Sequence, residues 1–109
     1  MIAIRTKGNI FLCDMEPEIY DQIRLSIMAA GECGFGALEE LAAVCKIRVL
    51  YMMGAGVILQ MDWDGLRFLR AMVHIATEEL RSYNSRIIHE ILRMLTCVME
   101  QTIESAPET

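Results

Sequence analysis

The chain has 109 residues and a formal net charge of −5, and 54% of its residues are hydrophobic and 23% are charged. This composition excludes a disordered or collagen-like chain, because there is ample apolar material for a core. It also argues against nucleic acid as a direct partner, since an acidic chain repels phosphate.

The apolar content itself predicts association with another chain. Globular domains are usually about 45–50% apolar, and a domain of this length hides only about two thirds of its unfolded surface. The length predicts one domain, residues 1–109, without internal repeat or linker. We therefore expect some apolar surface to be covered by a second polypeptide, in a homodimer or in a complex with a larger protein.

The N-terminal third of the chain predicts a small β-hairpin followed by a helix. In residues 1–13, two short β-favouring runs flank a turn at Gly8, which indicates a hairpin arm. Pro17 suits the first turn of a helix. Isoleucines at every fourth position then predict an amphipathic helix that ends near Ala30.

The middle of the chain admits two interpretations. Three glycines indicate a loop over residues 31–36, and a helix that is apolar nearly all round is expected from Ala37 to about Met53, before an extended segment over Val57–Met61. The alternative is a second hairpin over Ile47–Met61, because short apolar runs fit either a helix or a strand.

The C-terminal part predicts two long amphipathic helices. Asp62 is a suitable N-cap for the first, and Asn84 or Ser85 could cap the second. With a turn between them the helices pack antiparallel, and without one they form a rod of about 40 residues that needs a partner along its length. Residues 105–109 are expected to fray. The predicted fold is mainly α, with about four helices and the small N-terminal β-hairpin.

The sequence shows no arrangement of residues typical of an enzyme. The two histidines, His74 and His89, lie on polar helix faces, and no metal-ligand spacing occurs. The adjacent carboxylates of Glu39-Glu40 and of Glu78-Glu79 diverge around their helices and are interpreted as surface charge. We therefore expect no catalytic residues, no cofactor and no metal.

The expected compartment is the cytoplasm. The four cysteines form no C-x-x-C pair and are interpreted as free thiols. The longest uncharged apolar run, Val49–Leu59, is far shorter than the roughly 20 residues of a membrane span. The N-terminus also lacks the order of charged and apolar residues that marks a signal peptide.

One stretch, residues 39–51, resembles the helix-turn-helix of DNA-binding regulators. Its second helix would begin at Arg48, but there it offers one cation and no Asn, Gln or Ser to read bases. Together with the acidic net charge, this argues against direct DNA binding.

The predicted function is non-enzymatic control of another protein. In size, acidity and helix pattern the chain is similar to small bacterial antiactivators, which implies binding that occludes the dimer interface of a transcription regulator. Apolar helix faces would dock on the target and acidic flanks would steer it to a basic partner. Alternatives are a secretion chaperone, an immunity protein, or a helical dimer with a small-molecule pocket near Phe35, Tyr51 and Trp63. The expected partner-binding residues are Phe68, Met72, Ile88, Ile91, Leu92, Leu95 and Met99.

Overall fold

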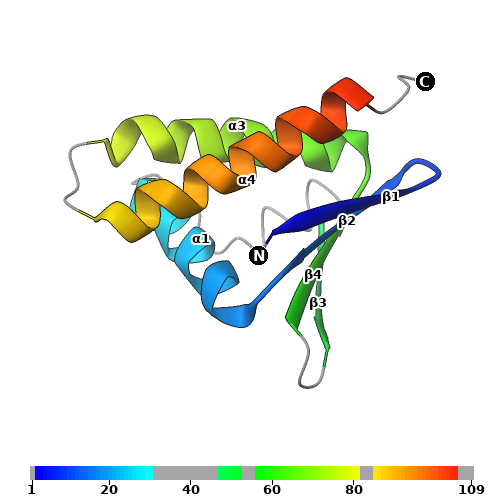
Figure 1. Ribbon diagram of the computed structural model, residues 1–109, viewed down its shortest axis with the longest axis horizontal. Coiled ribbons are helices and arrows are strands. Elements are labelled where there is room, and N and C mark those ends of the chain that lie inside the picture. Colours follow the sequence, from blue (N-terminus) through cyan, green and yellow to red (C-terminus); the bar gives the residue numbers. More distant parts are fainter. Residues whose placement is uncertain (1, 31–46, 53–55, 82–84, 106–109) are drawn as a thin grey trace.

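The described part of the chain folds into a four-stranded antiparallel sheet with three helices packed on one of its faces (Figure 1). A computed structural model describes residues 2–30, 47–52, 56–81 and 85–105. In chain order the elements are β1 (Ala3–Lys7), β2 (Ile10–Met15), α1 (Pro17–Ala30), β3 (Arg48–Met52), β4 (Gly56–Met61), α3 (Trp63–Glu79) and α4 (Arg86–Ser105).

The sheet joins two hairpins through their inner strands. Its order is β1-β2-β4-β3, and every neighbouring pair is antiparallel. The two-residue turn between β1 and β2 contains Gly8 at φ +63°, as the tight turns that suit twisted strands require. Alternate residues of β2 and β4 face the helices, so each inner strand contributes three side chains to the core: Phe11, Cys13, Met15, Val57, Leu59 and Met61.

The helices begin where the sequence provides suitable caps. Pro17 opens α1, and the Asp62 carboxylate accepts a hydrogen bond of 2.9 Å from the Gly65 N–H at the start of α3. The Ser85 hydroxyl accepts a longer one, of 3.4 Å, from the Ile88 N–H in α4. Because α3 and α4 are separate helices that pack antiparallel (Figure 1), the single rod is excluded.

A structural repeat relates the two halves of the sheet and their first helices. Seven buried positions of β2 and α1 recur 46 residues later in β4 and α3, as Phe11 and Val57 do. The equivalent pairs are Phe11/Val57, Cys13/Leu59, Met15/Met61, Tyr20/Leu66, Ile23/Leu69, Ser26/Met72 and Ile27/Val73. The described part of the fold is therefore two β-β-α units joined about an approximate two-fold axis between β2 and β4. The two units share buried positions and not residue types, so the sequence itself shows no repeat.

The predicted mainly α fold is wrong. Arg48–Met52 is strand β3, where the sequence analysis favoured a helix to about Met53, so the second hairpin is the correct interpretation. The N-terminal hairpin is half of a sheet and not a separate arm. The helix expected from Ala37 falls largely on residues 31–46, outside the described residues. Pairing of β3 with β4, which itself pairs with the distant strand β2, outweighs the local helical pattern.

Candidate functional site

One face of the sheet is not covered by any helix in the described part of the chain. The three helices pack on the face that carries the core residues, and the other face points away from them (Figure 1). We call this second surface the open face. Strand register and alternation place ten residues on it: Ala3, Arg5, Lys7, Ile10, Leu12, Asp14, Arg48, Leu50, Ile58 and Gln60.

The middle of the open face is apolar. Leu12 lies on β2, Ile58 on β4 and Leu50 on β3, opposite Ile58. All three side chains are half-buried by their neighbours, yet none of them belongs to the hydrophobic core. Solvent-facing positions of an antiparallel sheet are usually polar. Leu12, Leu50 and Ile58 instead form an apolar group on the face that the described helices leave uncovered.

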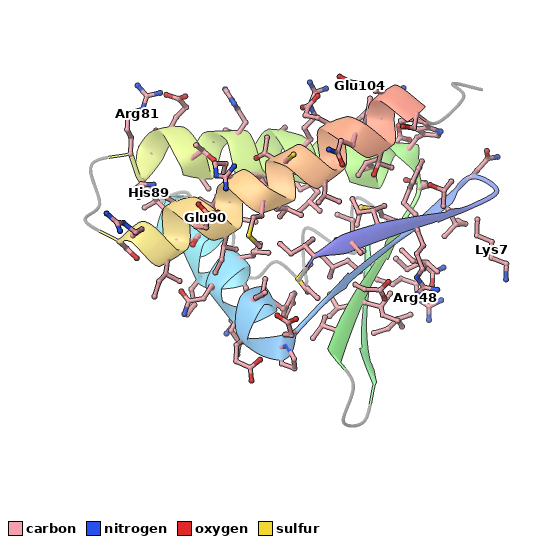
Figure 2. All side chains as sticks on the ribbon, in the orientation of Figure 1. Lys7, Arg48, Arg81, His89, Glu90 and Glu104 are labelled. Carbon is pink, nitrogen blue, oxygen red and sulfur yellow. The ribbon has the colours of Figure 1, made fainter. Side chains whose placement is uncertain are left out.

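Charged side chains surround this apolar centre, and they are mainly basic. Arg5 binds the Asp14 carboxylate through Nε at 2.7 Å and Nη2 at 3.1 Å, and these bonds raise the pKa of the Arg5 guanidinium. Arg48 and Lys7 project away from the helices (Figure 2), and no described acidic group forms an ion pair with either. Three cations and one anion give the open face a local charge of +2 on a chain of −5.

A second candidate site is a groove of about 450 Å³ between α3 and α4. Arg70 Nε lies 2.6 Å from Glu100 Oε1 across the groove, and this ion pair offsets the positive charge of the Arg70 guanidinium. The Arg67 guanidinium lies over the Trp63 ring, 5.4 Å from the ring centre. The groove is lined by Arg67, Arg70, Ala71, His74, Thr77, Thr96 and Glu100. Its central charges, on Arg70 and Glu100, are therefore paired with each other.

The residues predicted to bind a partner lie together, but inside the molecule. Phe68 and Ile88 are partly buried against the core. The other five are at most 9% exposed and contribute to the core: Met72, Ile91, Leu92, Leu95 and Met99. A role for them in partner binding stays a prediction, and it would require α3 and α4 to separate from the core.

The other sites considered from the sequence, a helix-turn-helix, a small-molecule pocket and a metal site, are not assembled in the described residues. Arg48–Met52 is a strand, so the second helix of the proposed helix-turn-helix is absent there. Trp63 packs edge-on against Phe11, with 4.9 Å between ring centres, while Phe35 lies outside the described residues. No group of three or more His, Cys, Asp or Glu side chains that could hold a metal ion occurs within the described ranges.

Sequence reasoning missed the open face because it assigned β3 to a helix. In a helix, Leu50 has no relation to Leu12 or Ile58, whereas in the sheet the three share one face. The signal that could have found it is the alternation along β4, where Ile58 and Gln60 alternate with buried residues. Along β3, the partly buried Val49 lies between Arg48 and Leu50.

Comparison with known proteins gives no match: no protein-family model, no curated protein and no solved structure matches this chain. Among the described residues, every helix is too short or too polar to cross a lipid bilayer.

Proposed function

We propose that this chain is a non-enzymatic binding protein that docks on another protein through the open face and masks the surface it covers. The observation that carries the proposal is the group of Leu12, Leu50 and Ile58 on a face without a described covering element. Covering these side chains would remove apolar area from water, which is the main favourable term in protein association.

The basic rim supports a partner with acidic groups around an apolar patch. Charges are screened beyond a Debye length of about 8 Å at physiological salt, so a docked partner responds to the local charge more than to the net charge. Arg48 and Lys7 supply that local charge on the open face. This differs from the basic partner that the overall acidity predicts.

Such a binding mode is suited to regulation. A protein that covers a surface needed by its target, such as the dimer interface of a transcription regulator, inhibits the target without any chemistry. We place this activity in the cytoplasm, because Cys13 and Cys97 are free thiols, as is usual in a reducing compartment.

The test is affinity capture from the source cell, followed by mass spectrometry, with the wild-type chain and two variants. Leu12→Glu places a negative charge in the centre of the open face. Ile87→Glu, at a side chain 68% exposed on α4, is the matched control. We expect an acidic protein that is retained by wild type and by Ile87→Glu and is lost with Leu12→Glu. Equal retention by all three chains would contradict the proposal, once circular dichroism has shown that both variants fold.

A further inference from the structure

The two outer strands of the sheet, β1 and β3, occupy equivalent places in the two β-β-α units but differ in how their edges are protected. β1 carries Arg5 and Lys7, and α4 packs over it. Charges and covering elements of this kind discourage further strand pairing. No described helix packs over β3 to a comparable extent, and within the described residues β4 alone pairs with it.

The free edge of β3 is suited to receive another strand. Its sequence, Arg-Val-Leu-Tyr-Met, has one charge, no proline and a high preference for β structure. An edge strand exposes unpaired backbone N–H and C=O groups, and these groups are a template for a further strand. Figure 1 shows strands β3 and β4 extending away from the three helices.

We propose that β3 pairs antiparallel with β3 of a second copy of the chain, about a two-fold axis at Leu50, so that two sheets join into one of eight strands. Leu50 is the central residue of β3, and pairing about it aligns the whole strand with its copy. Arg48 then lies opposite position 52 of the other copy, so like charges are not directly opposed.

Two observations favour a second copy over an unrelated strand. First, the chain already joins two β-β-α units in this way, because β2 and β4 pair antiparallel about the approximate axis between Cys13 and Leu59. Second, Leu50 lies beside Ile58 on the open face. Pairing about Leu50 therefore makes one continuous aliphatic row across the two copies. Ile58 and Leu50 of one copy are followed in this row by Leu50 of the partner subunit and Ile58 of the partner subunit.

The experiment measures mass in solution by light scattering for wild type and for two matched lysine variants. We expect about 25 kDa for wild type, twice the chain mass of 12.4 kDa. Leu50→Lys opposes two cations at the axis, so we expect a monomer. Leu12→Lys makes the same change on the open face away from the edge, and we expect it to remain a dimer.

A charge exchange separates lost pairing from lost folding. Mixing Leu50→Lys with Leu50→Glu places opposite charges at the axis, and we expect mixed dimers by native mass spectrometry. Three results would each overturn the proposal: a wild-type monomer at roughly 0.5 mM, a Leu50→Lys dimer, or no mixed dimers from two folded variants. A wild-type monomer at that concentration would mean that the dissociation constant of any dimer is millimolar or weaker.

If the Leu50 variants do not fold, hydrogen exchange on the wild-type chain decides the matter. In a free edge strand alternate N–H groups point to solvent and exchange rapidly, whereas pairing protects them. We expect all β3 amides to be protected at high concentration and alternate ones to lose protection on dilution. Rapid exchange of alternate amides at every concentration would overturn the proposal. Leu12 separates pairing from partner capture, because it lies on the open face away from the edge, whereas Leu50 belongs to both surfaces. A Leu12 variant that loses the captured partner and remains a dimer would show that the two are distinct.

Discussion

Cys13 and Leu59 lie opposite each other at the centre of the sheet, and each is the other's equivalent in the structural repeat. Residues at equal distances on either side of them also pair, as Phe11 does with Met61 and Met15 with Val57. The approximate two-fold axis therefore passes between these two side chains, which are at most 1% exposed. The Cys13 thiol, which can ionise, therefore occupies the position that the aliphatic side chain of Leu59 holds in the second unit.

The buried Cys13 thiol makes stability depend on alkaline pH. Burial, and to a lesser extent the Asp14 charge, raises its pKa from 9.0 to about 12. A pKa raised in the folded state gives stability that is complete below pH 9 and is lost as the pH rises toward 12. Between pH 8 and pH 10.5 we expect a loss of roughly 2 kcal/mol from this group in urea unfolding.

The control for this prediction is Cys13→Ala, which removes the titrating group. Over the same pH interval, the free energy of unfolding of Cys13→Ala should fall by about 2 kcal/mol less than that of wild type. Identical pH dependence in the two proteins would show that the Cys13 thiol ionises in the folded chain as easily as in the unfolded chain.

Gly56, which begins β4, is a position where a methyl group has no room. Its φ is +140°, and an added Cβ would lie 2.8 Å from the Met15 carbonyl oxygen. This atom belongs to the backbone and cannot rotate away. We expect Gly56→Ala to lower the free energy of unfolding by roughly 3 kcal/mol, from the strained φ and the close contact together.

Gly8 provides the comparison for Gly56. Its φ is +63°, but an added Cβ there would have no neighbour within 4 Å. Only the backbone preference is lost, so we expect Gly8→Ala to cost about 1 kcal/mol in the same unfolding experiment. Equal losses for the two variants would mean that the approach of Gly56 to Met15 is not close in solution.

Leu95 tests whether the apolar stripe of α4 stabilises the chain itself. The side chain is 0% exposed in the core. We expect Leu95→Ala to destabilise the protein by roughly 2–5 kcal/mol, because the truncation leaves a cavity. Ile87→Ala, on the same helix at a side chain 68% exposed, should change stability by less than about 0.5 kcal/mol. A Leu95→Ala protein as stable as Ile87→Ala would show that α4 does not pack on the core.

The repeat was hidden in the sequence because equivalent positions share burial and not chemistry. Tyr20 corresponds to Leu66, and Ser26 to Met72. Ser26 remains compatible with burial because its hydroxyl donates a 2.6 Å hydrogen bond to the Gln22 carbonyl. The equivalent positions carry different side chains, so aligning the two halves of the sequence does not reveal the repeat. The fold requires only that each of these side chains be buried.

The candidate site was also beyond local sequence reasoning. The apolar stripe of α4 indicated that Leu92 and Leu95 are removed from water, which the structure confirms, but it did not indicate which surface covers them. The core of the same chain does so. The open face depends on which residues of β2, β3 and β4 are aligned, and that alignment is fixed by hydrogen bonds between segments more than 40 residues apart.

What the sequence by itself determined is local: the N-terminal turn at Gly8, the start of α1 at Pro17, the cap of α3 at Asp62 and the apolar periods of the long helices. These features depend on contacts within a few residues, and the chain encodes them directly. Only the tertiary structure decided that β3 pairs with β4, that two β-β-α units face each other across Cys13 and Leu59, and that the described helices leave one face of the sheet uncovered. A short apolar run suits helix and strand alike, and the strand is selected by the neighbouring strands that pair with it.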